Sequence, residues 1–209
     1  MAGPEQLTLR SGRVRHARRL ATRRFRAKSH EFLAEGPQAV REALTVPGVV
    51  LEVFATPEAT RRYHGLTGSG VPWHVVGSDV VAGICETVHP QGLVARCRFV
   101  DTDLTTVLAP GPRLVVVCAD IRDPGNAGTV LRCADAAGAD AVVFTGDSVD
   151  PYNPKAVRAS VGSLFHVRLA VVQQPADAVA RCRSAGLTVL AADGTADLTL
   201  PPAAAGGLL

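Results

Sequence analysis

Apolar and polar positions along this chain follow two alternating periods, which is the pattern of a protein that combines strands with helices. Short runs rich in β-branched residues indicate strands, and longer segments with a 3.6-residue period indicate helices. In the first half of the chain we predict strands at 31–34, 49–55, 73–76 and 93–100, separated by helices at 37–44, 57–64 and 78–86. Together these elements predict a small α/β unit.

A break in both periods divides the chain. Residues 109–113 contain two prolines and a glycine, which neither a helix nor a central strand accommodates, and we place a domain boundary there. Beyond it, continuous apolar runs indicate parallel strands covered on both faces, at Leu114–Ala119, Ala141–Phe144, Phe165–Val172 and Leu187–Ala191. Helices are predicted between these runs. Right-handed crossovers then give an open parallel sheet that binds its ligand beyond the carboxyl ends of the strands.

The composition adds few details but excludes several classes of protein. With 209 residues, of which 47% are hydrophobic and 20% charged, the chain suits one or two globular domains and is neither fibrous nor wholly disordered. No apolar stretch approaches the ~20 residues of a membrane-spanning helix, so we expect a soluble, cytoplasmic protein with no membrane partner. The five cysteines are widely spaced without a C-x-x-C pair, so we expect reduced, partly buried thiols and no metal site.

Positive charge is concentrated at the N-terminus. Residues 1–30 carry nine Lys or Arg against one acid, whereas residues 31–209 carry thirteen against eighteen, and the two parts together give the net charge of +3. Arginine forks bind phosphate oxygens, so this basic arm predicts salt-sensitive, sequence-independent binding to a nucleic acid. The alternative is a solvated flexible tail, since Phe25 is its only aromatic residue. The residues that we expect to contact RNA are Arg18, Arg19, Arg23 and Arg24.

The loop after the first strand of the second half carries the most chemical information. Pro124-Gly125 predicts a tight turn, Asn126 can cap the following helix, and Gly128 permits close approach of a ligand or a neighbouring strand. Arg132 lies six residues after Asn126, about 1.7 helical turns, and we expect the two side chains to point roughly the same way and to meet one substrate. The alternative is that Asn126 is only a cap and Arg132 a solvated charge.

Three segments carry a family resemblance. Residues 123–132, which read Asp-Pro-Gly-Asn-Ala-Gly-Thr-Val-Leu-Arg, look like the first motif of the SpoU, or TrmH-type, RNA 2′-O-ribose methyltransferases of the knotted SPOUT superfamily. Residues 153–165 resemble the K-x-x-R-x-S-x-G-x-x-F segment of the same family. Residues 31–44 are similar to the start of the small ribosomal-protein-like domain that precedes the methyltransferase domain in many members.

The resemblance implies a fold and a function. After the basic arm (1–30), we expect a small ribosomal-protein-like α/β RNA-binding domain (31–108), a linker (109–113) and a parallel-sheet SPOUT (α/β knot) methyltransferase domain (114–209). The implied reaction transfers a methyl group from S-adenosylmethionine, without a metal, to a ribose 2′-hydroxyl of a structured RNA. Ribosomal RNA is the expected substrate, with transfer RNA as an alternative. The family also implies a homodimer whose site is shared between subunits.

By the same resemblance, Arg132 acts on the 2′-hydroxyl and its adjacent phosphate, and Asn126 shapes the same pocket. A guanidinium with a pKa above ~12 is a poor proton acceptor, so we favour Arg132 as a phosphate clamp and charge stabiliser over its being the base. Lys155 and Arg158 lie three residues apart on one predicted helix, where each can hold a backbone phosphate, and Ser160 of the same motif joins them as an expected RNA contact. The alternative for the two cations is ordinary surface charge.

Two later motifs of the family are absent from the sequence. One is a glycine–glutamate loop, and the other is the proline-then-Ser-Leu-Asn run that threads the knot and cradles S-adenosylmethionine. Asp193-Gly194-Thr195 and an Ala/Gly-rich segment stand in their place, so we expect an incomplete knot and assign no cofactor-binding residue. A non-catalytic RNA-binding module is therefore an open alternative. A dehydrogenase or α/β hydrolase is disfavoured because no G-x-G-x-x-G, Walker or G-x-S-x-G motif is present.

Overall fold

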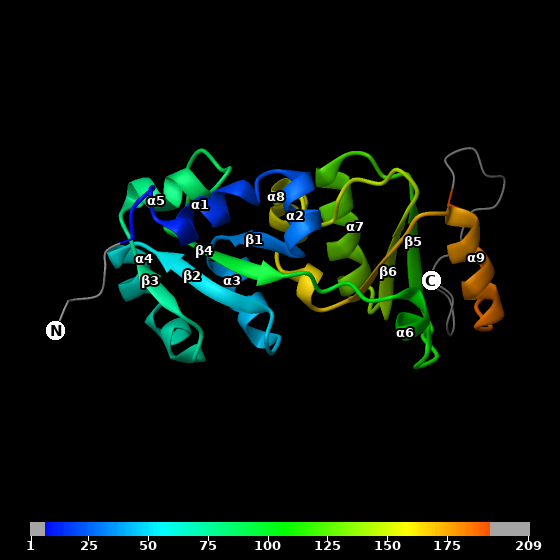
Figure 1. The fold of residues 1–209 in the computed structure, drawn as a ribbon. Helices are drawn as coiled ribbons and strands as arrows, with labels where there is room; N and C mark the ends of the chain where they lie inside the picture. The colour runs from blue at the N-terminus through cyan, green and yellow to red at the C-terminus, as the bar shows by residue number, and fades with distance from the viewer. Residues whose placement is uncertain (1–6, 193–209) are drawn as a thin grey trace.

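The computed structural model describes residues 7–192, which form two α/β units side by side (Figure 1). The first unit contains a four-stranded sheet in the order β1-β4-β2-β3, in which β4 is antiparallel to β1 and β2, and β3 is parallel to β2. Its strands are β1 (Glu31–Glu35), β2 (Val50–Ala55), β3 (Trp73–Val75) and β4 (Leu93–Arg98). Its helices include α3 (Pro37–Thr45), α4 (Pro57–Arg62), the 3₁₀ helix η1 (His64–Ser69) and α5 (Ser78–Ile84).

All seven elements predicted for this unit are present, with small changes at their ends. The helix expected at 57–64 stops at Arg62 and is followed by the 3₁₀ helix η1, which the pattern did not indicate. Thr56 caps α4 by accepting a hydrogen bond from the Ala59 amide at 3.1 Å, so the start of this helix follows from local capping chemistry. The last predicted strand ends at Arg98 rather than at residue 100.

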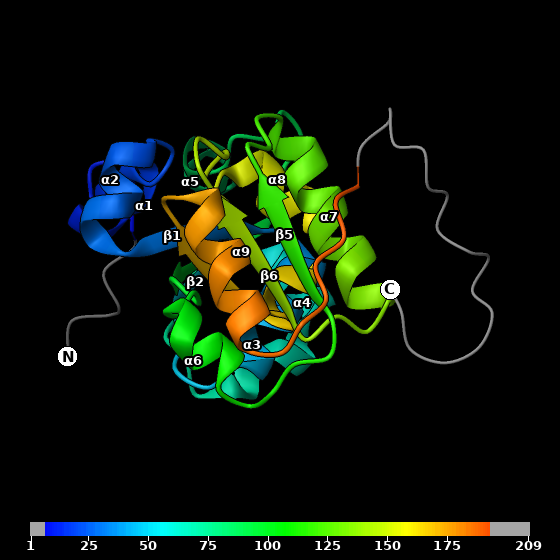
Figure 2. The same cartoon turned by 90° about the vertical axis from the view of Figure 1, so that its right-hand side faces the viewer.

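The second unit is built on a parallel sheet in the order β5-β6-β7, as its apolar runs predict. The strands are β5 (Val115–Ala119), β6 (Ala141–Thr145) and β7 (Arg168–Val172), and β6 is buried along its whole length. Helices α7 (Pro124–Ala136) and α8 (Pro154–Ser160) and the 3₁₀ helix η2 (Ser163–Phe165) cover one face. Helices α6 (Leu104–Leu108) and α9 (Pro175–Ser184) cover the other, and Figure 2 shows α9 in front of the sheet.

Two strand predictions need correction. The strand expected at Phe165–Val172 begins only at Arg168, because left-handed backbone at Val161 and Gly162 leads into η2. The run Leu187–Ala191 is not a strand, although its composition favours one. Within the described residues it has no ladder partner and its side chains are half-buried or exposed, so the two-sided burial that would fix such a run in a parallel sheet is not provided.

The structural boundary between the units lies earlier than the proline-rich break. Helix α6 was not predicted, and its Leu104 and Val107 are buried against the second sheet. A parallel bridge joins Asp101 to Leu169, so the chain has already entered the second unit before residue 104. The expectation of an incomplete knot concerns residues 193–209, which lie outside the described residues.

The basic arm is folded between residues 12 and 29 and is not a solvated tail there. It forms α1 (Gly12–Arg19) and α2 (Arg23–Ser29). Val14, Ala17 and Leu20 are fully buried in a small core with residues of the first sheet and of α5. The apolar and small residues between the arginines therefore form the buried face of an amphipathic helix, and this face packs on the sheet.

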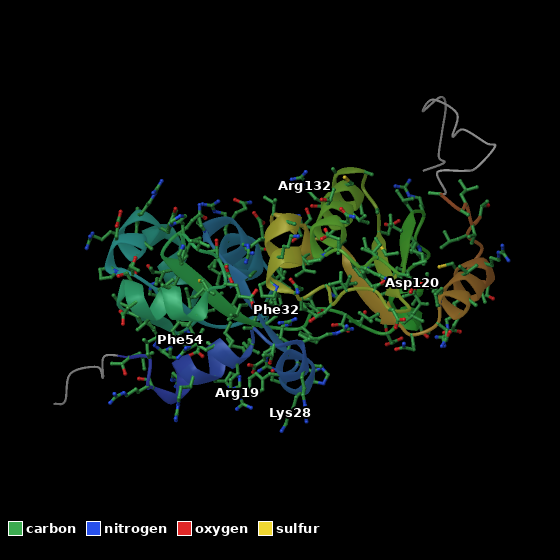
Figure 3. The ribbon with its side chains drawn as sticks, turned by 90° about the horizontal axis from the view of Figure 1, so that it is seen from above. Arg19, Lys28, Phe32, Phe54, Asp120 and Arg132 are labelled. Carbon is green, nitrogen blue, oxygen red and sulfur yellow. The ribbon has the colours of Figure 1, made fainter. Side chains whose placement is uncertain are left out.

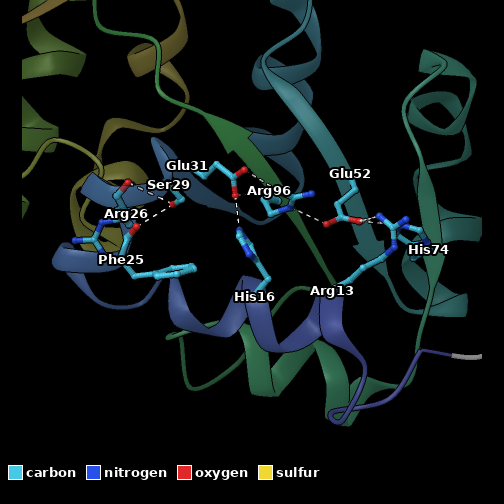
Figure 4. A network of polar contacts seen from close by, with 9 residues as sticks. All are labelled: Arg13, His16, Phe25, Arg26, Ser29, Glu31, Glu52, His74 and Arg96. Atoms are coloured by element: carbon cyan, nitrogen blue, oxygen red, sulfur yellow. Dashed lines mark hydrogen bonds and ion pairs between the residues drawn. The ribbon is translucent and has the colours of Figure 1, made fainter.

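A charge network fixes α1 to the sheet (Figure 4). The buried Glu52 carboxylate accepts hydrogen bonds from Arg13 and His74 at 3.0 Å and from Arg96 at 2.6 Å. Burial alone would raise the pKa of Glu52, but the charge and hydrogen bond of Arg96 outweigh it and the pKa lies below its ordinary value. Arg96 pairs with Glu31 as well. Because Arg13 is paired with Glu52, it is one of the cations of the arm whose charge is already compensated within the fold.

One core runs through both units. Phe32 of the first sheet contacts Tyr152 and Phe165 of the second unit, at ring-centroid distances of 4.8 and 6.0 Å. Phe99 stacks on Tyr152 at 3.8 Å. The Tyr152 hydroxyl accepts hydrogen bonds from the Val100 and Asp101 amides and donates to the Asp101 carboxylate. The two units are therefore joined by a packed aromatic seam rather than by a loose linker.

Other expectations from composition have mixed outcomes. All five cysteines are free thiols; Cys97, Cys118 and Cys182 are buried and Cys85 is half-buried, but Cys133 is exposed on α7. Burial raises the pKa of Cys118 to about 12, which keeps this thiol protonated. Among the described residues, none of the helices is both long and apolar enough to cross a bilayer.

Candidate active site

A hollow lies where β5 leads into α7, beyond the carboxyl end of the strand. Asp120 follows the strand with a positive φ of 55°, which turns the chain out of the sheet. The hollow has a volume of about 600 Å³, which is within the range of about 300–1,000 Å³ common for small-molecule sites. It is lined by Asp120, Ile121, Arg122, Asp123, Asn126, Thr129 and Val130.

Asp123, and not Asn126, caps α7. The Asp123 carboxylate accepts a hydrogen bond from the Asn126 amide at 2.9 Å, and Pro124 and Gly125 form the first helical turn instead of a separate tight turn. This hydrogen bond and the Lys155 ammonium hold the pKa of the Asp123 carboxyl below its ordinary value. Because Asp123 takes the capping role, the exposed Asn126 side chain is free of that role and contributes to the wall of the hollow.

Arg132 does not point the same way as Asn126. At 3.6 residues per turn, six residues rotate by about 600°, which leaves the two side chains about 120° apart around the helix axis. The residues of α7 that line the hollow are therefore Asn126, Thr129 and Val130, and Arg132 is exposed outside it. No hydrogen bond or ion pair to Arg132 is formed within the described part of the chain. The expectation of one shared direction was wrong because 1.7 turns is not close to a whole number of turns.

Gly128 permits a close approach, but of a helix and not of a ligand or strand. A Cβ atom built on Gly128 would lie 2.5 Å from the Ala156 carbonyl oxygen and 2.8 Å from the Ser160 amide nitrogen. Helix α8, which carries the second motif, therefore rests directly on the backbone of α7, which carries the first. The two motifs form one packed helix pair behind the hollow.

The three residues expected to hold RNA in the second motif have different places. Lys155 is exposed and its ammonium lies 3.3 Å from the Asp123 carboxylate. Arg158 turns toward the first unit and donates to the nearly buried Glu35 carboxylate at 3.1 Å, so it joins the two units and is only partly available to a phosphate. Ser160 is fully buried and donates to the Val157 carbonyl at 2.8 Å. RNA contact by Ser160 is therefore incorrect for this structure, since the side chain is closed off by α7.

The arginines expected to bind RNA in the arm are available. Arg18, Arg19, Arg23 and Arg24 are all exposed, and the Arg19 guanidinium lies over the Phe25 ring at 4.0 Å. Figure 3 shows Arg19 and Lys28 at one edge of the molecule and Arg132 at the opposite edge. In this view the labelled cations of the basic helices and Arg132 therefore lie on different sides of the chain.

The Asp120–Ile121 wall of the hollow is supported by residues that the sequence pattern did not indicate. The loop after β6 supplies three hydrogen bonds to the Asp120–Ile121 segment: the Asp147 amide to the Asp120 carboxylate at 2.8 Å, the Ile121 amide to the Ser148 hydroxyl at 3.2 Å, and the Val149 amide to the Ile121 carbonyl at 2.7 Å. An aspartate directly after a buried strand is a usable signal for Asp120. No local pattern indicates the pairing of loops 27 residues apart.

His166 braces this helix pair against the first unit and makes stability depend on pH. Its ring lies 2.8 Å from the Asp135 carboxylate and 3.1 Å from that of Glu42, and these two hydrogen bonds raise the pKa of His166. The stabilisation is therefore complete below the unfolded pKa of about 6.5 and is lost as pH rises through the folded pKa.

We expect the free energy of unfolding from urea titrations to fall as pH rises from 6 upward, and we expect His166→Asn to remove this part of the pH dependence. An unchanged pH profile in the variant would contradict the assignment.

Comparisons with known proteins agree with the two-unit organisation. The model of the SpoU rRNA Methylase family matches residues 113–204, and the model of the MRM3-like substrate binding domain matches residues 12–95. The second match begins at the start of α1, so the basic helices are included in that domain model and are not an appendage to it.

Named relatives cover most of this chain. It is 36% identical over 155 residues to the 23S rRNA (guanosine(2553)-2′-O)-methyltransferase RlmP of Bacillus subtilis. This match covers 74% of this chain and 60% of the relative. It is 33% identical over 187 residues to mitochondrial rRNA methyltransferase 3 of Xenopus tropicalis. This match covers 82% of this chain and 42% of the relative. The chain thus spans about half the length of these curated relatives.

Solved structures show the same fold. An AdoMet-bound rRNA methyltransferase from Sinorhizobium meliloti superposes with a TM-score of 0.71 and 28% identity, covering 85% of this chain and 67% of that one. The SpoU methyltransferase AviRb from Streptomyces viridochromogenes, in complex with the cofactor AdoMet, superposes with a TM-score of 0.75 and 26% identity, covering 84% and 68%. The predicted α/β architecture with a parallel-sheet SPOUT domain is confirmed by these similarities.

Proposed function

This chain belongs to the SpoU family of RNA methylases, and from that premise we propose that the protein transfers a methyl group from S-adenosylmethionine to a ribose 2′-hydroxyl of ribosomal RNA. The observation that carries the proposal is the placement of residues 123–132: the segment that resembles the first family motif forms a loop and helix beyond the carboxyl end of β5 and lines a hollow there. The relatives named as rRNA methyltransferases support the choice of substrate, and they do not favour a non-catalytic module. A cytoplasmic location is part of this proposal.

The hollow suits one side of a cationic, polar cofactor. Its lining carries two carboxylates, Asp120 and Asp123, against one guanidinium, Arg122, so the charge balance favours a cation such as a sulfonium group, while Ile121 and Val130 offer apolar surface. S-adenosylmethionine, when bound, supplies an activated methyl group. The contribution of this chain would be to hold that charge at Asp120 and Asp123 and to offer the free Asn126 side chain as a polar contact in the wall.

Arg132 would act on the RNA side of the reaction. A guanidinium stays protonated at neutral pH, so its role would be to hold the phosphate next to the target ribose and to stabilise negative charge on the 2′-oxygen during attack. Its exposure and its freedom from internal partners within the described residues suit a group that waits for substrate. Lys155, also exposed, would hold a second phosphate near the start of α8.

We further propose that the active assembly is a homodimer with a shared site. Arg132 points away from the hollow of its own chain, and the basic helices lie at the opposite edge of the molecule. A second copy would let the basic helices of one subunit hold an RNA whose ribose reaches Arg132 of the other.

The exposed arginines of α1 and α2 would bind RNA through its phosphates. Because Arg18, Arg19, Arg23 and Arg24 are exposed, replacing all four with glutamine is expected to weaken RNA binding at least tenfold and to lower the slope of log affinity against log salt by about three to four. Filter binding over a salt series measures both. Deleting residues 1–24 would not be a clean test, because it also removes the buried Val14, Ala17 and Leu20. Arg183→Gln on α9 is the matched control, and an unchanged slope in the quadruple variant would show that this face does not contact RNA.

The proposed function is tested by two measurements on the same preparation. Calorimetric titration with S-adenosylmethionine reports cofactor binding, and transfer of a labelled methyl group to ribosomal RNA, followed by nuclease mapping, reports the reaction and its 2′-O position. Binding and transfer together support the proposal. RNA binding without cofactor binding or transfer would instead favour the RNA-holding module as the activity of this chain.

A further inference from the structure

Arg26 belongs to the basic segment by sequence but is closed off from solvent. It is 2% exposed, and each of its three guanidinium nitrogens contacts an acceptor of the protein. Nε and Nη2 lie 2.8 and 2.7 Å from one Asp150 carboxylate oxygen, and Nη1 donates to the Leu20 and Ala21 carbonyls at 2.7 and 2.8 Å. Four of the five guanidinium N–H groups point at these acceptors, and the side chain is almost closed to solvent, so Arg26 is not available to an RNA phosphate.

The contacts of Arg26 connect two distant parts of the molecule. Leu20 and Ala21 are the residues that link α1 to α2, whereas Asp150 lies in the loop between β6 and α8. Asp150 also accepts a hydrogen bond from the Tyr152 amide at 2.8 Å, so its carboxylate is fixed on both oxygens. One side chain therefore ties the end of the basic helix pair to the second unit.

The loop that Arg26 holds is the one that supports the hollow. Val149, next to Asp150, donates to the Ile121 carbonyl, Ser148 accepts from the Ile121 amide, and Asp147 donates to Asp120. Asp120 and Ile121 line the hollow. A continuous path of hydrogen bonds and adjacent residues thus runs from the α1–α2 junction through Arg26 and Asp150 to the wall of the candidate site.

We propose that Arg26 is a positioning residue that holds the β6–α8 loop, and through it the Asp120–Ile121 wall of the hollow, in the geometry needed for methyl transfer. It is not one of the arginines that bind RNA. The catalytic consequence rests on the proposed function, while the effect on the loop does not. Because misplacement of a reacting group by about 1 Å costs up to about 100-fold in rate, loss of this clamp is expected to act on turnover more than on binding.

The test compares Arg26→Gln, Arg26→Lys and Asp150→Asn with Arg24→Gln, an exposed arginine on the same helix. Hydrogen exchange at the amides of Asp147, Val149 and Ile121 reports the loop, the salt dependence of RNA binding reports phosphate contact, and methyl transfer gives kcat and KM. We expect the first three variants to speed exchange at these amides about tenfold, to lower kcat about tenfold and to leave the salt slope unchanged. Arg24→Gln is expected to lower the salt slope by about one and to raise KM, with loop exchange unchanged.

Arg26→Lys tests the planar geometry of the guanidinium separately from its positive charge. Lysine keeps the positive charge but lacks the planar fork that reaches these three acceptor oxygens together, so behaviour like that of Arg26→Gln supports the clamp and wild-type behaviour overturns it. A fall in salt slope for Arg26→Gln equal to that of Arg24→Gln would also overturn the proposal, because it would mean phosphate contact. Faster exchange spread evenly over all helices would overturn it too, because that result indicates a general loss of stability.

If Arg26→Gln does not fold, Asp150→Asn removes the same ion pair from the other side. If the wild type transfers no methyl group, the proposed function fails while exchange and salt slope still decide the clamp.

Discussion

Replacing Arg132 with alanine is expected to lower methyl transfer by at least about 100-fold, the scale on which enzymes lose a group that stabilises developing negative charge. The fold should not change, because Arg132 is exposed and forms no hydrogen bond or ion pair within residues 7–192. RNA affinity should fall only by the share of one phosphate contact. Single-turnover transfer to ribosomal RNA, together with thermal unfolding and filter binding, measures all three quantities.

Two controls make this result specific. Arg183→Ala removes an arginine of α9 that is also exposed and does not line the hollow, and it should retain normal transfer. Mixing the Arg132→Ala chain with the quadruple α1–α2 variant tests the shared site, since a mixed dimer would contain one intact pairing of basic helices with Arg132. Restored transfer on mixing is the expected result. Near-normal turnover of the Arg132→Ala chain alone would remove Arg132 from the mechanism.

Gly128→Ala is expected to destabilise the protein by about 3 kcal/mol and to lower Tm by roughly 10 °C. The new methyl group would lie 2.5 Å from both the Ala156 carbonyl oxygen and the Ala159 Cβ, and backbone atoms of a packed helix cannot move aside as a flexible side chain can. Calorimetry measures the shift. Because α7 also carries Asn126, the variant should lose part of any cofactor affinity at temperatures where it is still folded.

Gly12→Ala is the matched control for this substitution. Gly12 lies at the start of α1, has no neighbouring atom within 4 Å of a built Cβ and has an ordinary φ, so alanine there should leave Tm unchanged or slightly raised. If Gly128→Ala were as mild as Gly12→Ala, the close packing of α7 on α8 would not be what holds the two motifs together.

The local pattern of apolar and polar residues was sufficient to predict the strands whose side chains are buried at regular positions. The strands β1 to β6 follow from alternating or continuous apolar runs, and the parallel order of the second sheet follows from the βαβ repetition. The run at Leu187–Ala191 has the same composition without becoming a strand, because strand formation also requires a neighbour, which composition does not encode. Helix α6 was missed because five residues contain too little of a 3.6-residue period to be recognised.

The candidate site was predictable in its location and less so in its geometry. A loop after a buried strand, followed by a family motif, correctly placed Asn126 at a hollow. The predicted direction of the Arg132 side chain was wrong because six residues are not a whole number of helical turns. Ser160 and Arg158 were assigned from motif membership, but their side chains depend on what packs against α8: the backbone of α7 for Ser160 and the Glu35 carboxylate for Arg158. Neither pairing has a local signal, since Arg158 and Glu35 are 123 positions apart and Ser160 packs on a different helix of the same unit.

The aromatic seam has a consequence for how the protein folds and can be divided. Because Phe32, Phe99, Tyr152 and Phe165 are shared across the two units, cutting the chain at the proline-rich segment would leave each fragment with half of a hydrophobic surface exposed to water. The units should therefore melt in a single cooperative transition, and neither should be stable as an isolated piece. In evolutionary terms, exchange of one unit for that of another family member would succeed only if the seam were exchanged with it.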